Sequence, residues 1–315
     1  MPVSKLYLTI DDQIDNLKNQ GLIFSNEKKA RSILKTHSYY SIVNCYCDLL
    51  VNRKSPRQFK VGATFDELLA IRDFDTSFRR FLFPQVLYVE EKFKAILING
   101  YCGAKNAQGG LIHSEDDYLC LDSFETTNVV KKKAATKLII ELSKAIESNK
   151  SKDPFKYQMK TYGYVPLWTL AGQMTFGQTS RFFECCTPEI RSSIADVLRL
   201  SESELRTVLK ILNVVRNCCA HNNRVFSVGI PEMLPLYLGV GRKKIATDRA
   251  SDHKFGSVLY CLKFLLSAKK FAKIIKELNA ELKRLHKSLK TIPFTSVLRK
   301  MGISTSMVHF FGIEY

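Results

Sequence analysis

Hydrophobic residues recur at spacings of three and four along much of this chain, which places them on one face of an α-helix. The pattern is longest over residues 64–98, 202–219 and 255–289. Thr64 begins a helix-capping pattern, and Ser201 stands at the start of the second stretch. The sequence therefore predicts a mainly α-helical protein with several long amphipathic helices.

Helix-breaking residues divide this pattern. Asn99-Gly100 is expected to end the first long helix, which Pro84 kinks or restarts. Residues 104–122, rich in Gly, Asn and Asp, are expected to form an exposed loop. Residues 52–60 are basic and predict a loop or short hairpin, whereas residues 39–46 are assigned to a helix.

These boundaries predict three parts. They are an N-terminal helical module over residues 1–62, a helical domain over residues 63–290 and a C-terminal tail over residues 291–315. The domain contains a basic helix over residues 123–149 and closes with a long basic helix over residues 255–289. The composition of this last helix fits binding to a membrane surface. The protein also needs the apolar stripe of the helix for packing, and we favour this structural interpretation.

The charge balance points to an anionic partner. The 315 residues include 48 Lys and Arg against 30 Asp and Glu, a net charge of +18. A protein this basic repels itself unless an anion neutralises it. Nucleic acid is the first candidate and an anionic membrane surface the second.

The cysteines and apolar runs indicate the compartment. Nine cysteines form no Cys-x-x-Cys pair, which argues against a zinc ribbon, and an odd number suits reduced thiols. No apolar run approaches the roughly 20 residues that cross a bilayer, and the N-terminus does not resemble a signal peptide. His113 and the carboxylates near it could be imagined as a metal site, but carboxylates in loops are usually only solvated. We expect a cytoplasmic protein without metal, cofactor or membrane partner.

Polar residues crowd the end of the 202–219 helix, where Arg216, Asn217 and His221 follow a buried face. At about 100° per residue, Arg216 and His221 diverge by about 140°, whereas Asn217 and His221 share a face. Two interpretations remain open. An Arg and a His near a helix C-terminus complement its dipole. Alternatively, they converge on a third object such as a phosphate, or meet a second copy across a two-fold axis.

Three groups of basic residues are candidate RNA contacts, together with Arg224 after the polar cluster. They are Lys131, Lys132 and Lys133; Arg242, Lys243 and Lys244; and Lys269 and Lys270. The first group is either an ordinary solvated helix face or a set of phosphate contacts. The second follows two glycines but lacks the spacing of a nucleotide-binding loop.

Two further features have structural and functional interpretations. Asp75 and Arg79, four residues apart, favour an ion pair along a helix face. Trp168 is most simply a core anchor, with stacking on a nucleic-acid base as the alternative.

Residues 216–224, Arg-Asn-Cys-Cys-Ala-His-Asn-Asn-Arg, resemble the Arg-Asn-x-x-Ala-His signature of HEPN-type ribonucleases, in the form seen in abortive-infection proteins of the AbiD/AbiF type. Other short motifs occur in the order that this family uses. They are Ser38-Tyr39-Tyr40-Ser41, Phe65-Asp66-Glu67-Leu68, Phe74-Asp75 with Phe78-Arg79, Pro166-Leu167-Trp168 with Phe176-Gly177, and Met301-Gly302. The resemblance thus spans nearly the whole chain.

The resemblance implies a HEPN-type helical bundle and a metal-independent endoribonuclease active in phage defence. His221 would transfer protons, Arg216 would stabilise the phosphate, and Asn217 would orient the imidazole or bind a phosphate oxygen. It also implies a homodimer joined through the Arg/His motif. The alternative is an RNA-binding protein that forms a stable ribonucleoprotein with a structured small RNA and turns over little or nothing.

Overall fold

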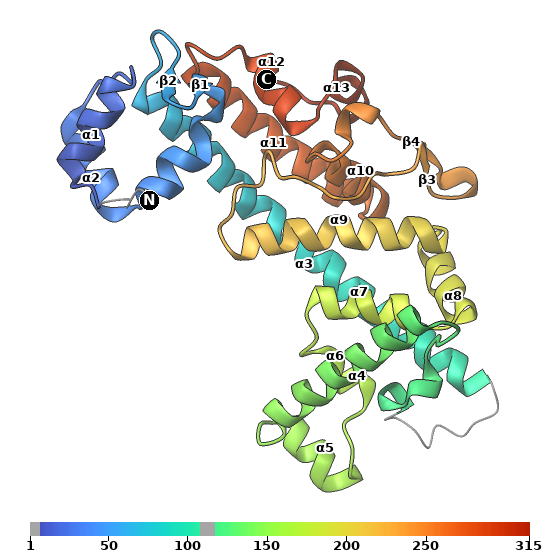
Figure 1. The fold of residues 1–315 in the computed structure, drawn as a ribbon. Helices are drawn as coiled ribbons and strands as arrows, with labels where there is room; N and C mark the ends of the chain where they lie inside the picture. The colour runs from blue at the N-terminus through green and yellow to red at the C-terminus, as the bar shows by residue number, and fades with distance from the viewer. Residues whose placement is uncertain (1–6, 108–116) are drawn as a thin grey trace.

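The computed structural model describes residues 7–107 and 117–315, and it is mainly helical as the sequence predicts (Figure 1). Two short helices come first, α1 (Ile10–Asn19) and α2 (Glu27–Thr36). The helix expected over residues 39–46 is confirmed, wound as a π-helix over Tyr40–Asn44. After a 3₁₀ turn, β1 (Val51–Lys54) and β2 (Arg57–Phe59) form an antiparallel hairpin, which confirms the basic hairpin.

The long helix α3 (Phe65–Ala107) runs through the middle of the molecule and packs against α6, α7, α8, α9 and α11 (Figure 1). The expected end at Asn99-Gly100 is wrong, because the helix continues through both residues and also contains Pro84. Gly100 faces Ile194 of α8, and a Cβ there would lie 2.5 Å from Ile194 Cγ1. This glycine therefore lets two helices approach closely and does not end α3.

We expect Gly100→Ala to lower the free energy of unfolding by about 1–3 kcal/mol, because the added methyl overpacks the contact between α3 and α8. Gly103→Ala is the matched control, since a Cβ there meets nothing within 4 Å. In a helix this control should be neutral or stabilising by up to about 1 kcal/mol. Urea unfolding of both variants measures the difference, and equal effects would contradict the close packing at Gly100.

A lobe at the far end of α3 is built from the next four helices (Figure 1). They are α4 (Val129–Asn149), α5 (Phe155–Tyr162), α6 (Leu167–Ala171) and α7 (Phe176–Cys185). Two 3₁₀ turns, Asp117–Leu119 and Leu121–Ser123, lead into this lobe. Helices α8 (Pro188–Leu198) and α9 (Glu202–Ala220) then return along α3.

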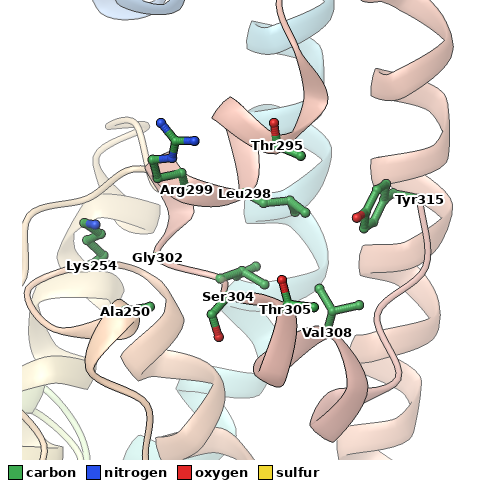
Figure 2. A pocket seen from close by; sticks show the side chains of 11 residues that line it. Ala250, Lys254, Thr295, Leu298, Arg299, Gly302, Ser304, Thr305, Val308 and Tyr315 are labelled. Carbon is green, nitrogen blue, oxygen red and sulfur yellow. The ribbon is translucent and has the colours of Figure 1, made fainter.

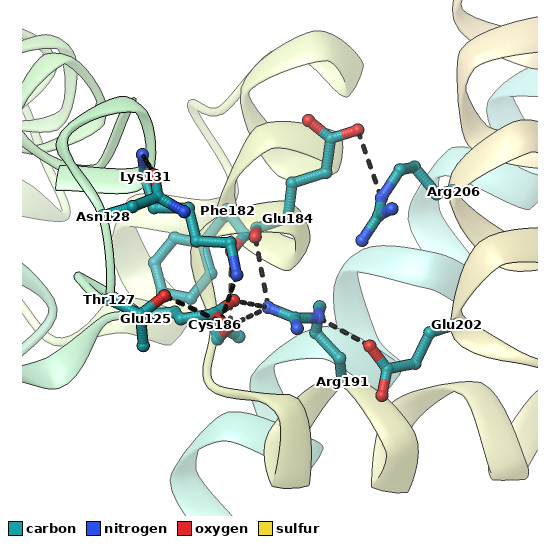
Figure 3. Close-up of polar contacts among 10 residues, drawn as sticks. All are labelled: Glu125, Thr127, Asn128, Lys131, Phe182, Glu184, Cys186, Arg191, Glu202 and Arg206. Carbon is teal, nitrogen blue, oxygen red and sulfur yellow. Dashed lines mark hydrogen bonds and ion pairs between the residues drawn. The ribbon is translucent and has the colours of Figure 1, made fainter. Parts of the chain in front are cut away.

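A buried ion cluster joins this lobe to α8 and α9 (Figure 3). Arg191 of α8 is almost fully buried and lies 2.7 Å from both Glu125 and Glu202. Its guanidinium also donates to the carbonyl oxygen of Cys186, and Lys131 pairs with the other oxygen of Glu125. The charges are compensated, so the cluster fixes where α9 begins without leaving Arg191 unpaired.

The rest of the chain packs against α3 and α9. Strands β3 (Tyr237–Leu238) and β4 (Ile245–Ala246) form a small hairpin. Its tip is a 3₁₀ turn, Gly241–Lys243, and another follows at Arg249–Ser251. The final helices are α10 (Gly256–Leu265), α11 (Ala268–Ser288), α12 (Phe294–Met301) and α13 (Thr305–Phe311).

The single helix expected over residues 255–289 is wrong, because Ser267 caps a second helix and splits the stretch into α10 and α11. The apolar stripe of α11 is buried and packs along α3. Packing therefore accounts for this stripe. Within residues 7–107 and 117–315, no helix combines the length and apolarity needed to cross a membrane.

Candidate functional site

Helix α9 positions the polar cluster. Ser201 and Glu204 form a capping box at its start. The six residues at the three-and-four spacing of its predicted buried face are all buried: Leu205, Val208, Leu209, Leu212, Val215 and Cys219. Asn222 ends the helix with a left-handed φ of 54°, while the N–H of Asn223 donates to the Cys218 carbonyl at 2.8 Å. This Schellman-type cap provides donors for carbonyls of the last turn of α9 and fixes the backbone of His221 at the helix end.

His221 and Asn217 are both exposed at this end. Within the described residues, neither side chain has a hydrogen-bond or ion-pair partner; the backbone N–H of His221 donates to the Asn217 carbonyl at 3.0 Å. The imidazole is thus presented to solvent from a rigid helix. A ligand can reach it without breaking a protein contact.

Arg216 is held from the side by α3. Its Nε donates to Glu90 Oε2 at 3.2 Å, and Glu90, which is buried, also pairs with Lys94 at 3.2 Å. The side chain of Arg216 is 25% exposed, and its two terminal NH₂ groups have no partner in the described part of the chain. Glu90 therefore orients the guanidinium and leaves its outer edge free to bind an anion.

Arg216 and His221 form no contact with each other in one chain. Arg216 bonds a carboxylate of α3, and its side chain donates to none of the last carbonyls of α9 within the described residues.

Asp75 anchors the segment that follows the cluster. Its Oδ1 accepts from the backbone N–H groups of Val225 and Phe226 at 2.9 and 2.8 Å, and its Oδ2 accepts from the Tyr46 hydroxyl at 2.8 Å. The ion pair with Arg79 is confirmed, and Arg79 also donates to the Asn223 carbonyl at 3.2 Å. The four-residue spacing predicted the ion pair, but no local pattern signalled the bonds to Val225 and Phe226.

Arg224 braces the same segment against the N-terminal module. Its guanidinium donates to both carboxylate oxygens of Asp48, at 2.8 and 3.2 Å, and lies 4.4 Å from the centroid of the Phe226 ring. Burial would raise the pKa of Asp48, but Arg224 and Lys300 outweigh it and hold that pKa below its usual value. Arg224, expected as an RNA contact, is therefore engaged in an internal ion pair.

The other candidate RNA contacts do not gather around His221. Lys131 pairs with Glu125, whereas Lys132 and Lys133 are exposed on α4. Lys269 is exposed at the start of α11, and Lys270 lies over the Tyr88 ring. These residues form surfaces separate from the polar cluster.

The turn carrying Arg242, Lys243 and Lys244 lies at the opposite end of α9, where the Gly239 N–H donates to Glu204 at 2.9 Å. Since Glu204 lies 17 residues before His221, about 26 Å of helix separates this turn from His221. Lys243 and Lys244 cover the rings of Phe264 and Tyr237 at 4.3 and 4.5 Å, while Arg242 is exposed. Burial, together with nearby cations, lowers the pKa of Lys243.

The two cysteines of the cluster do not offer a nucleophile. Burial raises the pKa of Cys218 above its usual value and that of Cys219 to about 12. Cys120, by contrast, is exposed. At pH 8 we expect iodoacetamide to label Cys120 well before Cys219, because the thiolate is the reactive form. Mass spectrometry of timed samples measures the order, and early labelling of Cys219 would contradict its buried, protonated state.

A groove of about 350 Å³ lies beside Gly302 of the Met301-Gly302 motif (Figure 2). Gly302 has a φ of 74°, and a Cβ there would lie 2.9 Å from the Ala250 carbonyl oxygen. The motif therefore fits a tight turn next to this groove. Although Lys254 and Arg299 line it, none of the expected catalytic residues does.

Two other expectations have different outcomes. Trp168 is 49% exposed, so its interpretation as a core anchor is wrong, and its ring remains accessible for stacking. His113 lies outside the described residues. Within those residues, no group of three His, Cys, Asp or Glu side chains is arranged to hold a metal ion.

The fold and the site together define an all-α helical protein that presents Arg216, Asn217 and His221 at the exposed end of a core helix. The model of the Abi-like protein family matches residues 32–227, more than half of the chain, and the chain belongs to this family. Membership supports a role in abortive infection, a form of phage defence. No curated protein and no solved structure matches the chain significantly.

The matched region begins in α2 and ends one residue after Phe226. It therefore contains the Asp75 anchor, the whole of α9 and the cluster at its end. Helices α10 to α13 lie outside it.

Proposed function

We propose that this Abi-like protein is a metal-independent endoribonuclease of the HEPN type that acts by cleaving RNA during abortive infection. One observation carries the proposal: at the capped end of α9 the His221 imidazole is exposed and has no polar partner among the described residues, and five residues earlier Glu90 holds Arg216 by Nε alone. The net charge of +18 supports a polyanionic substrate.

The chemistry needs only these residue types and the RNA itself. The ribose 2′-oxygen attacks the adjacent phosphorus while a base removes its proton, and the bond from phosphorus to the 5′-oxygen breaks as an acid protonates that oxygen. The products are a 2′,3′-cyclic phosphate and a 5′-hydroxyl. His221 transfers the proton, Arg216 binds the phosphate oxygens in a bidentate manner, and Asn217 orients the His221 imidazole or binds a phosphate oxygen.

A homodimer completes this mechanism. A single imidazole cannot be the base and the acid in the same step, and a second copy supplies another His221 across a two-fold axis. Asn217 and His221 are exposed at the end of α9, so a second copy can reach them. A protein that is monomeric by light scattering at micromolar concentration yet fully active would contradict this part of the proposal.

The alternative is a stable ribonucleoprotein with little or no turnover. It is favoured by the basic surfaces on α4, at the 241–244 turn and at the start of α11, which lie apart from His221. A single cleavage site does not require contacts spread over so much of the protein, whereas a structured RNA held over a large surface does.

The test compares the wild type with His221→Ala, both purified without nuclease treatment. RNA that co-purifies is extracted, and both proteins are incubated with total RNA in EDTA. Cleavage by the wild type alone, leaving cyclic-phosphate ends and sparing DNA, supports the nuclease. A discrete RNA held equally by both proteins, with no cleavage, rejects the nuclease in favour of the ribonucleoprotein.

A further inference from the structure

A second polar surface lies on the N-terminal module, in a groove of about 500 Å³. The groove is bounded by α1, the π-helix and the hairpin of β1 and β2. The side chains that matter for its chemistry are Tyr7, Tyr39, Tyr40, Asn44, Lys54 and Arg57. None of these residues was singled out for binding by the sequence motifs, although Tyr39 and Tyr40 belong to one of them.

The tyrosines offer flat, accessible faces. Tyr40 is 68% exposed and Tyr7 is 84% exposed, so neither ring contributes to the core. Tyr39 is half-buried, and its hydroxyl accepts from Arg57 Nη1 at 3.2 Å, which holds the ring and the guanidinium together. Exposed rings beside cations are the arrangement on which unpaired bases stack.

The charge of the groove also favours a polyanion. Arg57 Nη2 donates to Asn44 Oδ1 at 2.7 Å, so the guanidinium is positioned by neutral partners, and Lys54 is exposed beside it. Among the described residues, no carboxylate lines this groove. The two grooves between α3 and α11 differ, because carboxylates such as Glu281 lie among their basic residues.

Two glutamines in the lining of the groove add hydrogen-bonding capacity. The side-chain oxygens of Gln13 and Gln20 are buried and find no donor within the described residues. Both residues line the groove. A rotation of either amide would present this oxygen to the amino or imino group of a base.

The groove is connected to the cluster at the end of α9. Asn44 precedes Cys45, whose carbonyl oxygen accepts from Arg224 at 2.5 Å. Arg224 is three residues from His221, and three residues reach at most about 11 Å. Tyr46, which follows Cys45, donates to Asp75, and Asp75 in turn accepts from the backbone of Val225 and Phe226. These hydrogen bonds link the groove to the segment that follows His221.

We propose that this groove binds unpaired nucleotides of RNA. Bases stack on Tyr40 and Tyr7, and Lys54 and Arg57 contact the phosphates that join them. This inference rests on the proposed function, because it says where the protein holds the RNA strand that is cleaved at His221. A duplex keeps its bases stacked inside the helix, so the groove selects single strands.

The test measures binding without cleavage, in the full-length His221→Ala background. The probes are a short fluorescent single-stranded RNA and a blunt duplex of the same sequence, followed by anisotropy. Adding Tyr40→Ala should weaken single-strand binding by about 5- to 150-fold, the ratio that corresponds to 1–3 kcal/mol for one stacked base. Binding of the duplex should change little, and Tyr40→Trp should retain single-strand affinity because it keeps an aromatic face.

Tyr157→Ala is the matched control. Tyr157 is 56% exposed, lies between two lysines of α5 and is far along the chain from the groove. Its replacement should leave affinity unchanged. Unchanged affinity in Tyr40→Ala, or an equal loss in Tyr157→Ala, would overturn the assignment to this groove.

The two proposals fail in different ways. If the wild type does not cleave RNA but Tyr40→Ala loses single-strand affinity, the groove stands and the nuclease does not. If the wild type cleaves RNA and Tyr40→Ala binds as tightly as its parent, the nuclease stands and the groove is overturned.

Discussion

Replacing His221 with alanine is expected to slow RNA cleavage by about 10²–10⁴-fold, the usual contribution of a positioned acid or base. The thermal midpoint should barely move, because the His221 side chain is exposed and has no polar partner within the described residues. RNA affinity should also persist, since neither the basic surfaces nor the N-terminal groove includes this residue. Single-turnover cleavage of a labelled RNA in EDTA, with anisotropy and melting on the same samples, measures all three.

The matched control for this variant is His309→Ala. His309 is another exposed histidine, near the end of α13 and outside the family-matched region. It should retain the wild-type rate. Equal slowing in both variants would remove His221 from the mechanism, and unfolding of His221→Ala would assign the residue a structural role instead.

Replacing Asp75 with alanine is expected to lower the free energy of unfolding by about 3–5 kcal/mol, the cost of breaking a buried ion pair from one side. Asp75 is fully buried and accepts from Arg79, from Tyr46 and from two backbone N–H groups. Its loss leaves the Arg79 guanidinium partly buried without this carboxylate and leaves two buried N–H groups without an acceptor. Urea unfolding measures the change.

Asp73→Ala is the matched control on the same helix. Its carboxylate is 69% exposed and lies 3.4 Å from Arg72, a surface contact of small value. The control should stay within about 0.5 kcal/mol of the wild type. Similar losses in both variants would mean that the Asp75 network does not hold the segment after α9.

The Asp75→Ala variant also distinguishes a loss of cleavage caused by unfolding from a loss caused by removal of a catalytic group. Because Asp75 touches no residue of the Arg216, Asn217 and His221 cluster directly, its loss acts through the backbone of Val225 and Phe226. Cleavage should fall with the loss of folded protein and recover at low temperature, where more of the variant is folded. His221→Ala should not recover in this way.

Local features of the candidate site could be predicted from the sequence. The buried face of α9, its start at Ser201 and the divergence of Arg216 from His221 follow from helical periodicity and capping chemistry, which involve residues a few positions apart. The ion pair between Asp75 and Arg79 is local in the same sense. The resemblance to HEPN-type signatures added an expected role for each residue, which remains a prediction.

The partners of those residues could not be predicted. Arg216 meets Glu90 across 126 positions, and Asp75 meets Val225 across 150. Such pairs arise only when helices pack, and helical periodicity says which face is buried but not which helix covers it. The same gap explains Arg224, whose sequence position beside the cluster suggested RNA although its tertiary partner is Asp48.

By itself, the sequence determined that this protein is mainly helical and strongly basic, and that α9 ends in an arginine, an asparagine and a histidine. These properties depend on composition and on neighbours along the chain. Only the tertiary structure decided that α3 continues past Gly100, where Ile194 fills the missing side chain's space. It alone brought Tyr7, Tyr40 and Arg57 to one groove, because residues far apart in sequence become neighbours only through packing.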